Sequence, residues 1–326
     1  MARIFRIVGS TIFALLALFG TAWAGTALWL HLTGALRLAA LAALVMALVV
    51  AVVARRRARP LGWAALAIAA LAVAGWYQTI VPRHDRDWAP DVARGVRADV
   101  SGDHLTLHDV RDFDWITRDT AQERWITTRY DLEQLQTVDM LTSVWDNPDI
   151  AHLLVSFGFS DGQHVVFSVE IRREADEVFS EVGGFFHQFE LVLIAATERD
   201  IVKLRTNHRK EQVSLYPIDL TPQQRRDFFM AYVTLAQRLE ARPEFYNTLT
   251  ANCTTVVYAL AKTVNPDLPM DRRIVLSGRL PAFIDELGLL AGDSPLEDRQ
   301  RDALITPRAQ NAEEGDKFSD VIRNID

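Results

Sequence analysis

The chain has 326 residues, of which 35 are basic and 42 are acidic, and its formal net charge is −7 at pH 7. Seven of the basic residues and none of the acidic ones lie in residues 1–82, so the rest of the chain carries 28 basic and 42 acidic side chains. This acidic excess argues against nucleic acid as a partner, because phosphate backbones are bound by positive charge. The single cysteine, Cys253, excludes an internal disulfide bond.

Residues 1–82 predict a membrane anchor. Their apolar residues form three runs, Thr11–Leu32, Ala35–Ala54 and Leu61–Val81. Each run is close to the ~20 residues that a helix needs to cross a bilayer, so we expect three transmembrane helices. A cleaved signal peptide ending at Ala22-Trp23-Ala24 is the alternative for the first run, although the apolar residues continue past that point.

The arginines predict how this anchor is oriented. Arg3 and Arg6 precede the first run, the cluster Arg55–Arg59 separates the second from the third, and only Arg37 lies on the other side. Since arginines favour the cytoplasmic side, the chain after Pro82 is expected outside the cytoplasm. In a bacterium with two membranes this predicts a multi-pass protein of the inner membrane with a periplasmic domain. Cleavage of the first run would leave the placement of that domain unchanged.

Residues 83–290 are numerous enough for one domain with a sizeable core. Their first part predicts a hairpin from Val96–Val100 and His104–Val110. His104 and His108 are four residues apart, but a strand does not bring such a pair together as a helix would. No cysteine and no suitably spaced glutamate is nearby. We therefore predict neither a metal nor a cofactor.

A second hairpin is predicted in the stretch HLLVSFGFSDGQHVVFSVEIRR, which starts at His152. For its two alternating apolar sets to share one buried face, Phe159 must pair with Gln163 across a three-residue loop, with Gly162 in a left-handed conformation. The same register places His152 opposite Glu170. The other face is then polar and carries His152, Ser156, Gly158, Ser168 and Glu170.

An imidazole beside a carboxylate is the arrangement of a general base and its orienting partner. A polar strip that only faces solvent is the alternative explanation of this hairpin. His164, near the hairpin turn, and His187, in the stretch GGFFHQFE, are further candidate bases.

The chain between the hairpin and the cysteine predicts the rest of an antiparallel sheet and one long helix. Three stretches have strand-like sequences: Glu190–Ala196, Ile201–Leu204 and Val213–Tyr216. Thr221, followed by a proline and by Gln224 three residues on, predicts the start of a helix that runs to about Leu239.

The cysteine stands at the start of another predicted helix. Asn252 or a neighbouring threonine would cap this helix, and apolar residues follow Cys253 at helical spacing: Val256, Val257, Leu260 and Val264. At a helix start, unpaired N–H groups and the positive end of the helix dipole stabilise a thiolate and a developing oxyanion. This position favours Cys253 as a nucleophile. The alternative is that Cys253 is a small buried hydrophobic residue.

These elements resemble the bacterial family of the Lnb-type N-terminal periplasmic domain. The resemblance spans about residues 90–290 and rests on the order of the SFGFSDG hairpin, SVEIRRE, a TPQQRR helix start and FYNTLTANCTT. It implies an α+β, permuted papain-like fold, in which the histidine strand precedes the cysteine helix, as in NlpC-type hydrolases and lecithin retinol acyltransferase-like enzymes. Carried over by position, the nucleophile is Cys253 and the base is His152.

The resemblance implies acyl transfer on lipoproteins, from the glyceryl group to the amino-terminal cysteine. We therefore expect a thiol acyltransferase that acts on a lipid or lipoprotein at the membrane surface. In this hypothesis Glu170 orients His152, Ser168 is the alternative third member, and Asn252 supports the oxyanion. A cell-wall peptide amidase or peptidase and an inactive membrane-tethered binding domain are the alternatives. After a short helix at Leu280–Leu290, residues 291–326 are expected to form a flexible acidic tail.

Overall fold

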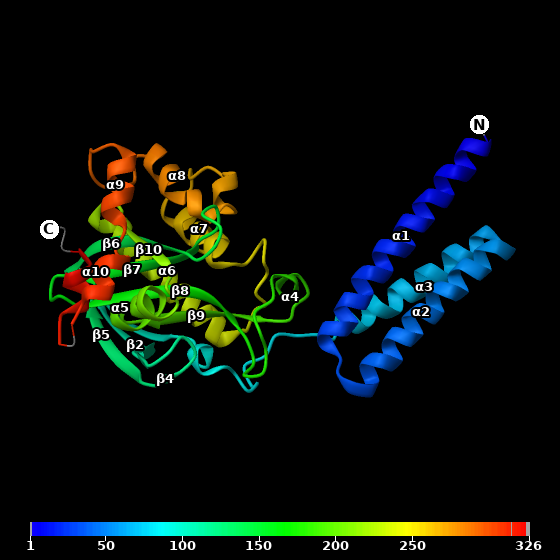
Figure 1. Ribbon diagram of the computed structural model, residues 1–326, viewed down its shortest axis with the longest axis horizontal. Coiled ribbons are helices and arrows are strands. Elements are labelled where there is room, and N and C mark those ends of the chain that lie inside the picture. The colour runs from blue at the N-terminus through cyan, green and yellow to red at the C-terminus, as the bar shows by residue number, and fades with distance from the viewer. Residues whose placement is uncertain (1, 314, 324–326) are drawn as a thin grey trace. The chain divides into compact units, whose positions relative to one another are not determined.

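The computed structural model describes residues 2–313 and 315–323, and within them the chain divides into two compact units. One unit comprises the residues up to Pro82 together with Ser180–Gln188, and the other comprises Arg83–Phe179 and the residues from Phe189 onward. The first is built mainly from three long helices, and the second from a sheet with helices (Figure 1). This confirms the expected α+β domain preceded by three apolar helices.

The long helices of the first unit are α1 (Ala2–His31), α2 (Gly34–Arg57) and α3 (Arg59–Tyr77). Each is long and apolar enough to cross a membrane. Large apolar side chains such as Phe5, Leu38 and Leu71 are exposed on them. A helix satisfies its own backbone hydrogen bonds, so such a surface is suited to lipid. The three helices therefore can serve as a membrane anchor.

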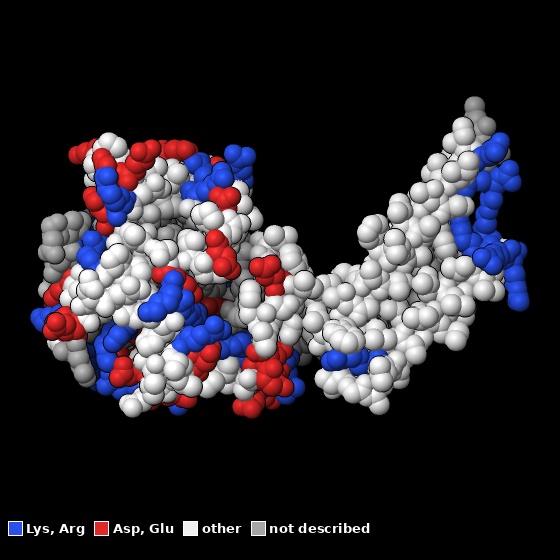
Figure 2. All heavy atoms as spheres, viewed as in Figure 1, with Lys and Arg blue, Asp and Glu red and all other residues white. Residues whose placement is uncertain are grey.

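Arginines gather at one end of this unit (Figure 2). There Arg55 of α2 donates a hydrogen bond of 3.0 Å to the carbonyl oxygen of Gly9 in α1. Gly62 allows α3 to approach α2 closely, because a Cβ at this position would lie 2.4 Å from the Cβ of Arg55. Close to the end of α1, Nε2 of His31 lies 2.6 Å from the carbonyl oxygen of Phe186, which follows the short helix α4 (Glu181–Phe185).

The second unit contains an eight-stranded sheet in the order β1-β2-β9-β8-β7-β6-β10, with β5 paired to β2. The pairs are antiparallel except for β2 and β9, which meet in parallel. The strands are β1 (Arg97–Ser101), β2 (His104–Arg111), β5 (Trp125–Asp131), β6 (Leu135–Val144), β7 (His152–Phe159), β8 (His164–Arg172), β9 (Glu190–Ala196) and β10 (Gln212–Pro217). A separate small sheet pairs β3 (Asp114–Trp115) with β4 (Ala121–Gln122).

The predicted register of the β7–β8 hairpin is confirmed. The N–H of Phe159 donates to the carbonyl oxygen of Gln163 at 2.9 Å, Leu154 pairs with Ser168, and Gly162 has a φ of +86°. The polar face of the hairpin, however, does not face solvent. Ser156 is fully buried and donates to Glu198.

Two helices form the core against one face of the sheet. They are α6 (Pro222–Ala241) and α7 (Cys253–Val264), and α6 begins with the predicted capping box at Thr221 and Gln224. Phe229 and Tyr232 of α6 are fully buried against Phe157 and Phe167 of the hairpin, with ring centroids 4.8–5.7 Å apart. The chain after α7 continues through η4 (Arg272–Ile274) and η5 (Ser277–Arg279) to α8 (Leu280–Glu286).

The opposite face of the sheet is covered as well, which corrects two sequence expectations. The stretch Ile201–Leu204 is not a strand: it lies in α5 (Glu198–Lys203) and the following π-helical turn η3 (Leu204–His208). The described part of residues 291–326 is not a flexible tail but forms α9 (Leu296–Ala303), α10 (Thr306–Asn311) and α11 (Phe318–Arg323).

The C-terminal helices are fixed by a few apolar side chains among many charged ones. Ile305, Ala309 and Ile322 are fully buried in the core on this second face. Arg323 lies 2.6 Å from Glu198 and 2.7 Å from Asp139, two buried carboxylates of the sheet region. The sequence of residues 291–326 did not indicate this packing, because its few buried apolar side chains hardly change the high average polarity of the segment.

Candidate active site

Cys253 occupies the first position of α7, as its sequence context predicts. Asn252 is the N-cap: its Oδ1 accepts hydrogen bonds of 2.9 Å from the N–H groups of Thr254 and Thr255, and its own N–H donates to Oγ1 of Thr255 at 3.0 Å. The first N–H groups of a helix have no intrahelical partner, so the backbone at Cys253 points hydrogen-bond donors toward the end of the helix. Cys253 is partly buried.

The side-chain amide of Asn252 has a structural role in this geometry. Its Nδ2 donates to the carbonyl oxygen of Thr248 at 2.7 Å, which closes the loop before the helix. Within that loop, Asn247 and Ala251 exchange two backbone hydrogen bonds of 3.0 and 3.1 Å. Asn252 therefore holds the loop and the helix start.

His152 begins β7 and is brought to Cys253. The imidazole and the thiol lie close enough for each to act on the charge of the other, and the thiol also lies against the backbone of Leu153. Nε2 of His152 lies 3.1 Å from Oε1 of Glu170 and 2.8 Å from Oγ of Ser168. Nε2 of His152 is therefore engaged with the side chains of Ser168 and Glu170.

Ser168 links the histidine to the carboxylate. Its hydroxyl donates to Oε1 of Glu170 at 2.7 Å and accepts from the ring N–H of His152. Both residues proposed as the third member, Glu170 and Ser168, therefore contact His152. Ser168 bridges the two side chains by hydrogen bonds, whereas only the Glu170 carboxylate has a charge that can stabilise an imidazolium.

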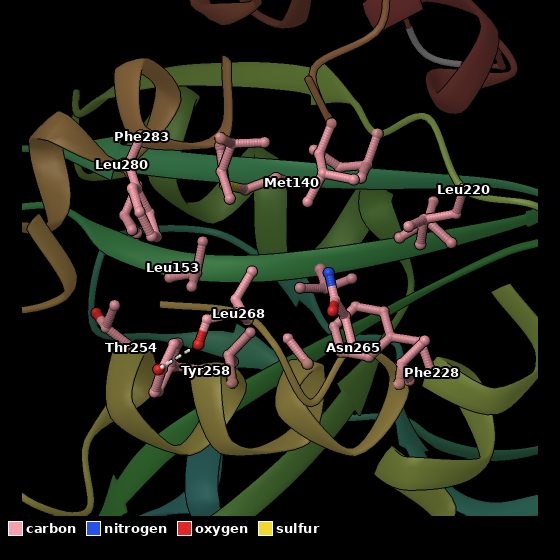
Figure 3. A pocket seen from close by; sticks show the side chains of 18 of the residues that line it. Met140, Leu153, Leu220, Phe228, Thr254, Tyr258, Asn265, Leu268, Leu280 and Phe283 are labelled. Carbon is pink, nitrogen blue, oxygen red and sulfur yellow. Dashed lines mark hydrogen bonds between the residues drawn. The ribbon is translucent and has the colours of Figure 1, made fainter. Parts of the chain in front are cut away.

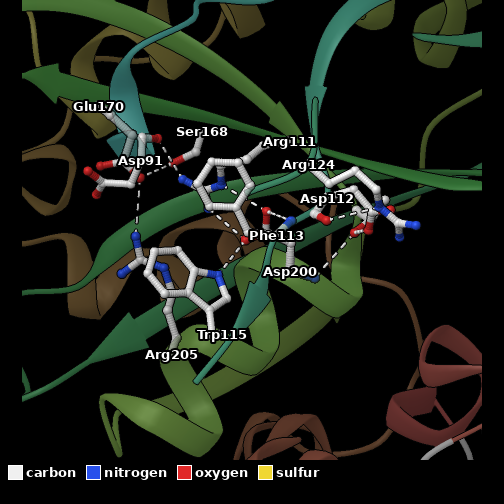
Figure 4. Close-up of polar contacts among 11 residues, drawn as sticks. Asp91, Arg111, Asp112, Phe113, Trp115, Arg124, Ser168, Glu170, Asp200 and Arg205 are labelled. Carbon is white, nitrogen blue, oxygen red and sulfur yellow. Dashed lines mark hydrogen bonds and ion pairs between the residues drawn. The ribbon is translucent and has the colours of Figure 1, made fainter. Parts of the chain in front are cut away.

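A buried arginine that no sequence pattern indicated completes this cluster (Figure 4). Nη2 of Arg205, in η3, lies 3.2 Å from Oε1 of Glu170, and Nη1 lies 3.1 Å from Oε2 of Glu211. Ser143 of β6 donates a hydrogen bond to Glu211. Arg205, Glu211 and Ser143 are all buried, so the cluster forms a continuous polar path under the histidine.

These contacts shift the ionisation of the whole cluster. Burial raises the pKa of Glu170, but the charges of His152 and Arg205 outweigh burial and hold it well below its usual value. Burial lowers the pKa of His152, but the Glu170 carboxylate, with the Cys253 thiolate, outweighs burial and raises it to about 9. Burial raises the pKa of Cys253, and the charge on His152 outweighs this and lowers it. All three shifts favour a thiolate beside an imidazolium.

A second element that sequence reasoning missed positions the histidine strand. Oγ of Ser277, in η5, accepts from the N–H of Ala151 at 2.8 Å and donates to its carbonyl oxygen at 2.6 Å. A Cβ at Gly278 would lie 1.9 Å from the carbonyl oxygen of Pro148. This clamp holds the residue directly before His152.

The other histidines considered from the sequence are engaged elsewhere. His164 lies by the hairpin turn, where its Nδ1 is 3.3 Å from the carbonyl oxygen of Gly162. His187 belongs to the first unit, where it stacks on Tyr77. His104 and His108 both lie on β2, and the described residues contain no group of three or more His, Cys, Asp or Glu side chains that could hold a metal ion.

An apolar cavity of about 130 Å³ lies beside the cysteine helix (Figure 3). It is bounded by one side of α7, by β6 and β7, by α6, and by the segment from Leu268 to Leu289. Thr254 and Leu153, the neighbours of Cys253 and His152 in the chain, form part of its wall.

The family comparison covers this entire site. Residues 121–278 match the family model described as the Lnb N-terminal periplasmic domain, and the match includes His152, Ser168, Glu170, Arg205 and Cys253. No curated protein and no solved structure matches the chain significantly. This match, together with three apolar helices long enough to cross a membrane, fits a membrane-anchored periplasmic protein.

Proposed function

We propose that the chain is a thiol acyltransferase of the bacterial inner membrane, because residues 121–278 match the model of the Lnb N-terminal periplasmic domain. In this proposal three transmembrane helices hold a permuted papain-like domain on the periplasmic side, where Cys253 accepts an acyl group from a lipid or lipoprotein. The observation that carries the proposal is the proximity of the Cys253 thiol to His152, whose Nε2 lies 3.1 Å from Glu170.

The first half of the reaction forms a thioester. His152 holds the proton of the thiol, and the Sγ of Cys253 attacks the carbonyl carbon of an ester. The carbonyl oxygen becomes an oxyanion, which the N–H of Cys253 at the start of α7 stabilises, a contribution often worth ~3–4 kcal/mol per donor. The C–O bond to the alcohol then breaks while His152 gives its proton to the leaving oxygen. The alcohol departs and the acyl group remains on Sγ.

The second half transfers the acyl group. An amine attacks the thioester carbonyl, His152 takes the proton of that amine, and the C–S bond breaks to return the thiolate. Water in place of the amine would make the same site a hydrolase. Glu170 keeps the imidazole oriented and stabilises its charged form in both halves, while Arg205 keeps Glu170 ionised.

The anchor favours a lipid ester as donor. Only the short segment Arg83–Asp87 lies between Pro82 and Trp88, which forms a β-bridge with Glu174 inside the second unit. In this proposal so short a tether keeps the domain near the membrane. Such tethering raises the effective concentration of membrane-embedded substrates and gives little benefit toward diffusing peptides. A cell-wall peptide amidase is the second candidate, since the same three side chains also serve amide cleavage.

Mass spectrometry of Cys253 tests the proposal. The full chain, purified in a bile-salt detergent and incubated with a diacylglyceryl-modified peptide or a phospholipid, should gain the mass of a fatty acyl chain on Cys253. Cys253→Ser should abolish this gain, and His152→Ala should slow it by about 10²–10⁴ while circular dichroism stays unchanged. His104→Ala, an exposed histidine on β2, is the matched control and should behave as the wild type.

The alternatives give different results in the same assay. Cleavage of cell-wall peptides that needs Cys253, without acylation by any lipid, would identify an amidase. If neither reaction depends on Cys253 or His152, the domain is a membrane-tethered binding module.

A further inference from the structure

An apolar cavity lies beside α7, and the reaction of Cys253, His152 and Glu170 does not itself need such a cavity. It is lined by apolar side chains of β6, β7, α6, α7 and the segment from Leu268 to Leu289. Figure 3 shows Thr254 at one end and Leu220 and Phe228 at the other. The cavity therefore follows the cysteine helix along its length.

One end of the cavity is lined by the chain neighbours of Cys253 and His152, while those two side chains are not part of its lining. Thr254 directly follows Cys253, and Leu153, whose backbone contacts the thiol, lines the same end. The lining continues along α7 as far as Asn265, eleven residues further on. At 1.5 Å per residue this corresponds to roughly 16 Å of helix. A linear group attached to Sγ would have to pass Thr254 and Leu153 to enter the cavity and could then extend along it.

The lining is suited to hydrocarbon and offers few free polar atoms. The hydroxyl of Tyr258 donates to the carbonyl oxygen of Leu268 at 3.0 Å, and Oε1 of Gln224 accepts from the N–H of Thr221 at 2.9 Å. Apolar cavities of this kind stay dry and bind apolar ligands. A volume of about 130 Å³ holds roughly ten water-sized spheres.

We infer that this cavity binds one fatty acyl chain of the donor, with the ester carbonyl at Cys253 and the chain running along α7 toward Phe228 and Leu220. The inference rests on the proposed function and adds the part of the substrate that the domain recognises. A peptide of the cell wall would bring polar groups into a cavity that cannot pair them, whereas an acyl chain buries apolar surface on both sides.

Chain-length selectivity tests the inference. In a bile-salt detergent, which has no acyl chain, the full protein is acylated with p-nitrophenyl esters of four to sixteen carbons. Ala261 lines the middle of the cavity and Ala259 is exposed on the same helix. Ala261→Phe should slow acylation by the sixteen-carbon ester at least tenfold and leave the four-carbon ester within twofold of wild type. Ala259→Phe, the matched control, should change neither rate.

The short ester separates the two proposals. Acylation by the four-carbon ester with no effect of Ala261→Phe on the long ester would overturn the cavity inference and leave the thiol chemistry standing. Failure of every ester to acylate Cys253 would overturn the proposed function. Binding is then read independently of the thiol, with a sixteen-carbon fatty acid that carries a terminal diazirine and with the Cys253→Ser variant. Photolabels on α6, α7 or the Leu268–Leu289 segment support the cavity, and labels confined to α1–α3 overturn it.

Discussion

Nε2 of His152 lies 3.1 Å from Oε1 of Glu170 on the neighbouring strand, at the position that the register of the β7–β8 hairpin dictates. The same carboxylate is held from behind by Arg205 at 3.2 Å. Glu170 therefore lies between two cationic groups, and it influences Cys253 by holding the imidazole in its charged form. This chain of contacts makes the reactivity of the thiol depend on a residue that does not touch it.

The pH dependence of thiol reactivity should reveal this dependence. Wild-type His152 stays charged up to about pH 9, because its pKa is raised to that value. Glu170→Gln removes the carboxylate that raises it, so His152 loses its charge at lower pH and the thiolate loses its counter-ion. We expect iodoacetamide to alkylate Cys253 at pH 7 at least about tenfold more slowly, and the alkaline limit of acylation to move below pH 9.

Glu133→Gln is the control for this experiment, because Glu133 is an exposed glutamate of η2 (Leu132–Gln134). Its pH profile should match the wild type. Equal profiles for Glu170→Gln and the wild type would show that Glu170 does not tune the imidazole.

Arg205→Met should destabilise the domain and impair the site together. The substitution leaves Glu170 and Glu211 in a buried region without their shared cation, which typically costs about 3–5 kcal/mol. For a domain of this size the melting temperature should fall by roughly 10 °C. Differential scanning fluorimetry of the full chain measures this change, and Arg205→Lys should recover part of it. An unchanged melting temperature for Arg205→Met would mean that the two carboxylates find other partners.

Ser277→Ala should disturb the approach to His152. It removes the only side chain seen to satisfy both the N–H and the carbonyl group of Ala151 within the described residues, and an unpaired buried polar group costs about 1–3 kcal/mol. We expect a lower melting temperature and slower acylation of Cys253 by the four-carbon ester. Ser294→Ala, at an exposed position, should have neither effect. A Ser277→Ala protein with normal acylation would show that this clamp is not needed to position His152.

Arg323→Leu tests whether the C-terminal helices belong to the folded domain. Its guanidinium contacts Glu198 and Asp139, which are almost fully buried. Loss of this cation should lower stability by about 3 kcal/mol, whereas Arg301→Leu, on the exposed side of α9, should change it little. Chemical unfolding followed by tryptophan fluorescence measures both. Equal stability of the two variants would favour a loosely attached C-terminal segment.

The topology of the anchor is tested with reporter fusions. Alkaline phosphatase fused after residue 90 should be active in cells, because the reporter folds only outside the cytoplasm, and a fusion after residue 58, between α2 and α3, should be inactive. A stable but inactive fusion after residue 90 would require an even number of crossings.

The features that the sequence determined by itself are those set by neighbouring residues. Three long apolar runs predict three helices, alternation around Gly162 predicts the hairpin and its register, and Asn252 predicts the helix start at Cys253. In each case the physical cause lies within a few residues: side-chain periodicity, turn geometry or a capping hydrogen bond. The opposition of His152 and Glu170 could be deduced because a hairpin register is itself local.

Only the tertiary structure decided the rest. The contact between Cys253 and His152, the cation of Arg205 behind Glu170, the clamp of Ser277 and the cavity along α7 all join segments that are distant in the chain. Such contacts depend on which helices and loops pack against each face of the sheet. The C-terminal helices show this most clearly: their few buried side chains have meaning only against the second face of the sheet, where Ile305 and Ile322 exclude water.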